Sequence, residues 1–211
     1  MKRAKMKSST NDYLKENFSM YIFTIILFIM GVIFGSYVIY SLSLSQKQEL
    51  LSIFNLFYLD IDTLSLLDSQ VVFKQVLIDN LKYLGVLWFL GLSIVGMPLI
   101  FILIFTKGLI VGFTVSFLIF ELNWQGLLFS LASVIPQNII IVPVLIIAGV
   151  TGINFSLSLI KHKGNKSYSY QQSITSYTLI ILILGGFLVL ASGFETFVSP
   201  YLMKGIMTLV N

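Results

Sequence analysis

The chain has 211 residues, of which 57% are hydrophobic and only 10% charged, and its formal net charge is +4. A soluble domain is about 25% charged, so this chain has too few charged side chains to cover a surface that faces water. Its mean hydropathy is +0.95. The composition excludes an ordinary soluble fold and predicts an all-α, polytopic integral membrane helical bundle in contact with membrane lipids.

Charge and cysteine content exclude several functional classes. The basic residues lie in short clusters beside apolar segments and form no basic face, so we expect no nucleic-acid binding. The chain has no cysteine and one histidine, His162, which leaves no thiolate chemistry and no usual soft-metal site. The sequence motifs of serine hydrolases and zinc peptidases are missing. We therefore expect no enzymatic activity, no catalytic residue, no cofactor and no metal.

Apolar segments separated by charges locate the membrane crossings. A crossing helix needs about 20 apolar residues, because the hydrocarbon core is about 30 Å thick and each residue rises about 1.5 Å. Each charge at the centre of such a helix costs about 2.5–3.5 kcal/mol, so the crossings fall in charge-free intervals. The first apolar run is too long for the core of a signal peptide and is expected to remain in the chain. About five transmembrane regions are predicted, at 18–40, 81–105, 106–122, 127–160 and 174–194.

Basic residues predict the orientation of these regions. The cytoplasmic segments would be the leader 1–17, a turn at 105–108 and the loop 161–173, with the N-terminus inside and the C-terminus outside. Nine of the 13 basic residues fall in them, as the positive-inside rule requires, namely Lys2, Arg3, Lys5, Lys7, Lys15, Lys107, Lys161, Lys163 and Lys166. The alternative is a re-entrant hairpin of 108–120 with 127–135, because the first of these is short for a crossing. It would put 161–173 outside, against the charge bias, so we favour five crossings.

The loop 41–80, expected outside the membrane, contains helical patterns. The segment Ser45–Gln48 matches a capping box, in which a serine and a glutamine satisfy the first amides of a helix. An apolar stripe at three- and four-residue spacing follows it, formed by Leu50, Ile53, Phe54, Phe57 and Ile61. An amphipathic helix lying flat on the membrane would show this pattern, and so would a docking face for an extracytoplasmic partner. The candidate partner-binding residues are Leu50, Ile53, Phe54 and Phe57.

Two prolines interrupt the fourth predicted region. Residues 126–160 as one helix would be about 53 Å long, well beyond the hydrocarbon core. Pro136 lacks an amide hydrogen and predicts a kink or break, and Pro143 predicts a second kink. The side chains of Gln137 and Asn138 can donate hydrogen bonds to the carbonyls that such a break exposes. We interpret these four residues as a structural broken helix. A channel or transporter with the break at its centre is the alternative.

Small residues at four-residue spacing predict close helix packing. Gly31 and Gly35 form one such face, and Gly108, Gly112 and Ser116 form a second. Small side chains let two backbones approach and gain dispersion contacts in lipid, where the hydrophobic effect does not drive helices together. The spacing leaves open whether these faces meet within one chain or between chains, so a homo-oligomer is one of the alternatives.

Six blocks of sequence, in order along nearly the whole chain, resemble the stage II sporulation protein M family. They are Met30–Gly35, Ser41–Gln48, Gly96–Ile100, Lys107–Val115, Val134–Ile140 and Leu190–Pro200. The resemblance implies a non-enzymatic scaffold in the mother-cell membrane, at the sporulation septum and the engulfing membrane. It also implies two partners, the stage II sporulation proteins P and D. The scaffold would recruit and localise these peptidoglycan hydrolases for septal thinning and forespore engulfment.

The block around Pro136 departs from a wider group of similar membrane proteins. Those proteins often carry Pro-His-Gly where this chain has Pro136, Gln137 and Asn138. Any role of their ionisable groups is therefore not transferred to this chain, which weakens the transport alternative.

Overall fold

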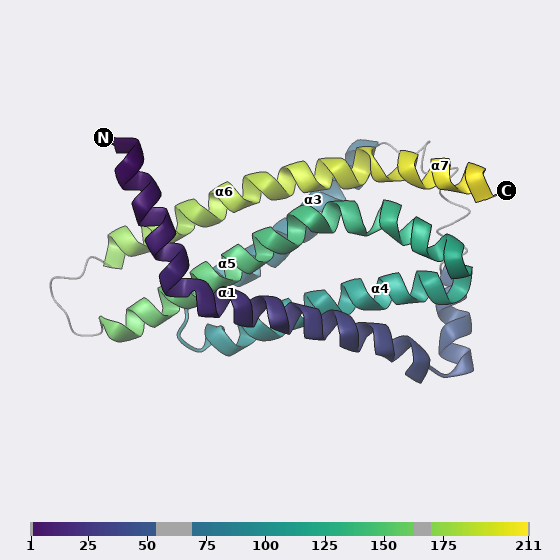
Figure 1. Ribbon diagram of the computed structural model, residues 1–211, viewed down its shortest axis with the longest axis horizontal. Helices are drawn as coiled ribbons and strands as arrows, with labels where there is room; N and C mark the ends of the chain where they lie inside the picture. The colour runs from purple at the N-terminus through teal and green to yellow at the C-terminus, as the bar shows by residue number, and fades with distance from the viewer. Residues whose placement is uncertain (1, 54–68, 163–169, 211) are drawn as a thin grey trace.

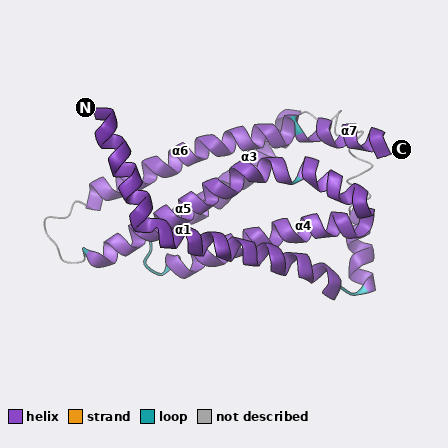
Figure 2. Cartoon of the chain, in the orientation of Figure 1, coloured by secondary structure: helices purple, strands orange, loops and turns teal. Residues whose placement is uncertain are grey.

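The structure is a computed structural model. It describes the backbone of residues 2–53, 69–162 and 170–210, and the side chains of 17–53, 70–162, 170–203 and 205. The helices are α1 Lys2–Ser41, α3 Ser69–Gly91, α4 Gly96–Ser133, α5 Ile135–Lys161, α6 Tyr170–Phe197 and α7 Ser199–Val210. A short helix covers residues 44–53, and no strand occurs in the part of the chain that is described (Figure 2). The all-α prediction is confirmed.

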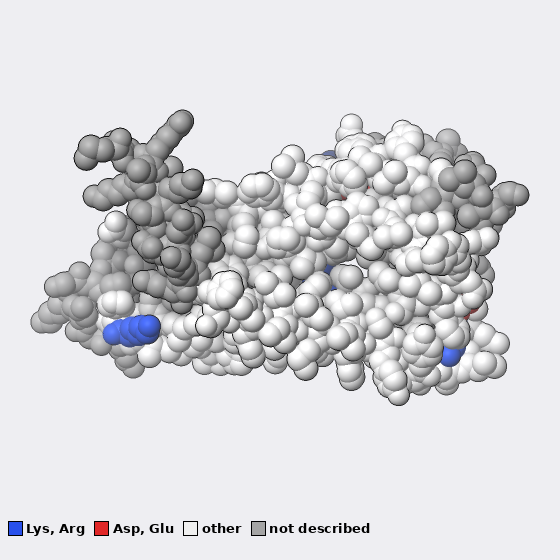
Figure 3. Space-filling model, viewed as in Figure 1, with Lys and Arg blue, Asp and Glu red and all other residues white. Residues whose placement is uncertain are grey.

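Four helical segments are long and apolar enough to cross a membrane. They are Asn17–Ser41, Gly96–Ser133, Ile135–Lys161 and Tyr170–Met203. The surface agrees with this assignment, because the face shown in Figure 3 is almost free of charged side chains along its middle. Helix α3 is not among the four, since it carries three charged residues, Lys74, Asp79 and Lys82, along its 23 residues.

The long helices lie side by side along the longest axis of the molecule (Figure 1). Along the chain, α1 runs from the end that holds the N-terminus to the opposite end, α3 returns, α4 runs forward, α5 returns and α6 runs forward. The C-terminus therefore lies at the end opposite to the N-terminus. Helix 44–53 turns across the far end of the bundle, where α1 stops.

The boundary between the second and third predicted regions is wrong. The regions 81–105 and 106–122 would meet at a turn near Lys107, but α4 is continuous there. The chain turns instead at residues 92–95, between Gly91 and Gly96. Gly96 is required at this turn, because a Cβ at that position would lie 1.8 Å from the carbonyl oxygen of Leu90. The hydropathy pattern hides the turn, since all its residues are uncharged.

The fourth predicted region, 127–160, also differs from the structure. The chain reverses at Asn123, which has a φ of 52°, a left-handed value that asparagine tolerates better than most residues. The segment after it folds back, and Gly126 lies against the backbone of Leu118. A second, smaller interruption at Val134 separates α4 from α5. Residues 96–122 run beside α1 to the far end of the bundle, which is a full pass and not the short dip of the re-entrant alternative.

Helix α5 forms the centre of the bundle. It is the most enclosed of the four apolar segments, and its buried residues join those of α3, α4 and α6 in one hydrophobic core. The ring of Phe155 stacks on that of Tyr177 in α6, with centroids 4.8 Å apart. On the α4 side, Gly149 lies against Ile104. The remaining long helix, α1, packs mainly on α4 at the edge of the bundle.

Interleaved glycines join α1 to α4. A Cβ added to Gly31 or Gly35 would lie 2.2 or 2.1 Å from a carbonyl oxygen of α4, and one added to Gly108 or Gly112 would lie 2.2 or 2.1 Å from a carbonyl oxygen of α1. The two small-residue faces thus meet within one chain. Ser116, one turn beyond Gly112, is half-buried. We call these four glycines the glycine seam.

Substitution in the glycine seam should destabilise the bundle. We expect Gly108→Ala to lower the free energy of unfolding by about 1–3 kcal/mol, because a methyl group would press on the backbone of Phe28. Gly186 in α6 is the control, since a Cβ there meets nothing within 4 Å. Gly186→Ala should be neutral or stabilising by up to about 1 kcal/mol, the gain in helix propensity. Unfolding of both variants in detergent would measure the difference, and equal effects would contradict the seam.

Candidate functional site

Hydrogen bonds between side chains and backbones tie α3 to its neighbours near the N-terminal end of the bundle. The hydroxyl group of Tyr177 donates to the carbonyl oxygens of Leu87 and Trp88, at 3.3 and 3.1 Å. The indole nitrogen of Trp88 donates to Thr178 at 3.2 Å. Gly91 and Gly152 lie against the Tyr177 hydroxyl group, which leaves no room for larger side chains. Helix α3 is therefore an integral part of the bundle.

Further along α3, polar side chains gather between α3, α4 and α6. Asn80 donates its amide hydrogen to the hydroxyl of Ser192 at 3.1 Å. The hydroxyl of Tyr83 donates to the carbonyl of Leu103 in α4. The ammonium group of Lys107 lies 5.8 Å from the centre of the Tyr83 ring. We call Asn80, Tyr83, Lys107, Ser192 and Glu195 the interior polar cluster.

Lys107 and Glu195 are the two charged members of this cluster. Both side chains are half-buried, and their opposite charges interact electrostatically. Each lies in a segment that is apolar enough to cross the membrane. Charged side chains at such depths usually face the interior of a bundle and pair with one another. The interior polar cluster is therefore the strongest functional candidate among the described residues within the apolar segments.

Sequence reasoning missed this cluster for one reason. It placed Lys107 in a cytoplasmic turn and Glu195 at the outer end of its span, on opposite sides of the membrane. In the structure, Lys107 is 11 residues after the start of α4, about 17 Å along the helix at 1.5 Å per residue. The positive-inside rule assumes that lysines lie in the loops between crossings, whereas Lys107 lies within a helix.

The two charges should be energetically coupled. We expect Lys107→Met or Glu195→Gln alone to destabilise the protein more than the two changes together, because each single change leaves one charge without its counterpart in an apolar environment. The coupling free energy should be about 1 kcal/mol or more. A double-mutant cycle from detergent unfolding measures it. The uncharged pair Thr106→Ala and Thr114→Ala serves as a control that should be additive, since each hydroxyl bonds only to a carbonyl of its own helix.

The residues of the predicted broken helix lie at the junction of α4 and α5. Pro136 is in the first turn of α5, where a missing amide hydrogen costs little. The amide of Asn138 donates to the carbonyl of Val134 at 2.8 Å, beside a longer backbone bond of 3.4 Å to the same oxygen. Gln137 instead accepts a hydrogen bond from Ser199 at 3.5 Å. Helix α5 continues through Pro143.

Two buried oxygen atoms near this junction have no hydrogen-bond partner among the described residues. They are Oδ1 of Asn138 and Oγ1 of Thr196. A buried polar atom without a partner usually marks a bound water or a strained site. Thr196 follows Glu195 directly, so the C-terminal half of α6 carries several polar groups that face the bundle.

The sequence agrees with one protein family. A comparison with family models matches residues 24–200 to Stage II sporulation protein M. The chain belongs to the stage II sporulation protein M family. No curated protein and no solved structure gives a significant match. Membership supports a sporulation-related membrane protein and agrees with the resemblance of the six sequence blocks.

Helix 44–53 carries the described part of the candidate partner-binding face. Its cap differs from the prediction. The backbone amide of Ser43 donates to the side-chain oxygen of Gln46 at 3.0 Å, and the backbone amide of Gln46 donates to the hydroxyl of Ser43 at 3.4 Å. The capping box therefore begins at Ser43, two residues before the predicted Ser45. The ammonium group of Lys47 lies 4.5 Å from the centre of the Phe120 ring, so the helix contacts α4 just before the reversal at Asn123.

The predicted partner-binding residues are only partly within the structure. Ile53 is 59% exposed and Leu50 is half-buried. Phe54 and Phe57 lie outside the described residues. The part of the helix that is described therefore presents at least one large apolar side chain to its surroundings.

Metal binding finds no candidate in the described side chains. No group of three or more His, Asp or Glu residues among them could hold a metal ion. The expectation that the chain acts without metal or cofactor stays a prediction.

Proposed function

We propose that this protein is a non-enzymatic scaffold in the mother-cell membrane at the sporulation septum. It would recruit and localise the stage II sporulation proteins P and D, which degrade peptidoglycan during septal thinning and engulfment. The family match over residues 24–200 carries this proposal. The arrangement of helices supports it, because the bundle offers a rigid membrane platform with one short helix across its far end (Figure 1).

The scaffold would cross the membrane five times, with α3 as the additional crossing. Helix α3 has 23 residues, about 35 Å at 1.5 Å per residue, which is long enough to span the hydrocarbon core. It packs antiparallel to α4 and is hydrogen-bonded to α4 and α6 along its length. The N-terminus would be cytoplasmic and the C-terminus outside, as the basic leader and the loop 161–173 predict.

Accessibility of introduced cysteines tests this topology, and the absence of native cysteine makes the readout clean. We expect a membrane-impermeant maleimide to label Gln48→Cys from outside the cell, and Ser93→Cys and Asn165→Cys only after the membrane is opened. Ser93 is exposed in the turn between α3 and α4. Labelling of Ser93→Cys from outside would exclude a crossing by α3, and outside labelling of Asn165→Cys would reverse the orientation of α5 and α6.

Helix 44–53 and the stripe that continues from it are the proposed docking face for the hydrolases. This face would lie on the side of the membrane where peptidoglycan is found. Its helix is anchored by the contact of Lys47 with Phe120, while Ile53 is exposed. The exposed side chain of Ile53, together with the apolar stripe that the sequence predicts beyond it, fits recognition by a protein groove, in which a few apolar anchors supply most of the binding energy.

Charge introduced into the stripe should prevent recruitment. We expect Ile53→Asp, or Phe54→Asp with Phe57→Asp, to reduce co-purification of the hydrolases from sporulating cells by about tenfold or more, because a carboxylate in an apolar contact must lose its water. Tyr201→Asp is the matched control, since Tyr201 is 77% exposed on α7 at the same end of the molecule. Undiminished recruitment by membrane-inserted stripe variants would contradict the docking face.

A channel or transporter is not proposed. The side-chain amide of Asn138 is bonded to the backbone at the start of α5, as expected for a structural role. Pro136 likewise occupies a position where helices accept proline. The interior polar cluster also has internal partners, which suits packing between helices.

A further inference from the structure

One face of α3 carries polar and charged side chains and is not covered by any other described part of the chain. It is formed by Gln75, Ile78, Asp79, Lys82, Gly85 and Phe89, which recur at three- and four-residue spacing and are all exposed. The opposite face of α3 packs into the bundle through Leu84 and Leu87, which are 3% and 0% exposed. We call the exposed set the α3 stripe.

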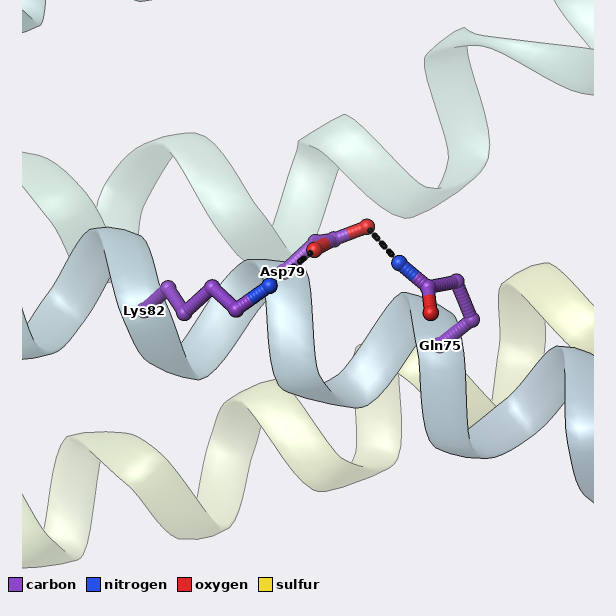
Figure 4. Close-up of polar contacts among 3 residues, drawn as sticks. All are labelled: Gln75, Asp79 and Lys82. Carbon is purple, nitrogen blue, oxygen red and sulfur yellow. Dashed lines mark hydrogen bonds and ion pairs between the residues drawn. The ribbon is translucent and has the colours of Figure 1, made fainter.

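Charges lie at the centre of this stripe. Asp79 accepts hydrogen bonds from Gln75 at 2.9 Å and from Lys82 at 3.2 Å, and Figure 4 shows Asp79 between the other two on successive turns. The side chains of Lys82 and Asp79 are 67% and 57% exposed. The ion pair thus points away from the bundle.

The depth of this ion pair follows from the neighbouring contacts. Asp79 and Lys82 lie near the middle of the 23-residue helix. Asn80, between them, is bonded to Ser192, and Tyr83 is bonded to Leu103. Ser192 and Leu103 both lie within apolar segments that can cross the membrane. If α3 crosses as proposed, the ion pair lies inside the hydrocarbon layer, where lipid tails offer no hydrogen bonds.

A second copy of this chain fits the α3 stripe better than lipid does. The stripe carries both charges, one turn apart, so it complements itself when two α3 helices run in the same direction about a twofold axis. Lysine side chains on a helix point toward its N-terminus, which directs Lys82 of one copy toward Asp79 of the other. Gly85 meets nothing within 4 Å, so it would let the two backbones approach one turn further along.

We infer that the α3 stripe is the interface of a homodimer within the membrane. The inference rests on the crossing of α3 proposed above, and it does not depend on the hydrolases. In the dimer, Lys82 and Asp79 exchange their bonds within one helix for bonds between two helices, and both charges are removed from lipid. The scaffold would then present two copies of helix 44–53 on the same side of the membrane.

Cysteine cross-linking of the full-length chain in bacterial membranes that lack the sporulation partners tests this interface. We expect oxidation with copper phenanthroline to link Gly85→Cys into a disulfide dimer. Gly186→Cys is the matched control, because it is also a helical glycine with open space around it but lies on α6, outside the α3 stripe. It should remain monomeric.

Charge exchange identifies the occupant of the stripe. In the Gly85→Cys background, Asp79→Lys should reduce cross-linking by about tenfold, since two lysines then face two lysines. Co-expression of the Asp79→Lys chain with a Lys82→Asp chain under two tags, both in the Gly85→Cys background, should restore cross-linking as mixed dimers. Both lysines of the first chain then face aspartates of the second.

Three outcomes would overturn the inference. The first is a monomeric Gly85→Cys in every background. The second is failure of the Asp79→Lys and Lys82→Asp chains to cross-link with each other, which would mean that the charges of two copies do not meet. The third is labelling of Gly85→Cys by an impermeant maleimide in intact membranes, which would mean that the stripe faces water. Loss of hydrolase recruitment with intact cross-linking would instead contradict only the proposed function.

Discussion

The structure depends on one constraint, which is that hydrocarbon cannot form hydrogen bonds. Helices satisfy their own backbone groups, so the described chain is built from helices alone. Polar side chains follow the same rule. The hydroxyls of Thr24, Ser36, Thr106, Thr114 and Thr151 each donate to the carbonyl four residues earlier in their own helix. Where a side chain cannot be satisfied in this way, it points to another helix, as Asn80 does toward Ser192.

Two kinds of contact hold the bundle together, and each follows from the residues available. Helix α1 is joined to α4 mainly through the glycine seam, where backbones touch, and the hydroxyl of Ser36 adds a hydrogen bond to the carbonyl of Gly112 at 3.4 Å. Helix α3 is joined to α4 and α6 by hydrogen bonds that the side chains of Tyr83, Trp88 and Tyr177 donate. The contact between α1 and α4 depends mainly on close backbone packing, and the contacts of α3 depend on hydrogen bonds. Together they hold α1 and α3 against α4 and α6.

The sequence predicts many residues of the candidate site by their type, but it does not predict which of them contact one another. The glycine faces were predicted from spacing alone, whereas their meeting within one chain was not. Lys107 was assigned to a turn because hydropathy is continuous from 83 to 106, and only the close packing of Gly96 on Leu90 reveals where the chain turns. The helix cap at Ser43 was displaced to Ser45 because both positions fit the same four-residue pattern, and only geometry selects between them.

The sequence by itself determined the solvent of this protein, its all-helical class and its family, because these depend on composition and on local period. Tertiary structure decided which polar residues share an interior. Lys107, Glu195, Asn80 and Tyr83 come from three helices, and their meeting depends on helix direction, turn position and rotation about each axis. A charge-free stretch of sequence gives no information on helix direction, turn position or rotation. They are set by packing over the whole bundle, so no window of the sequence contains them.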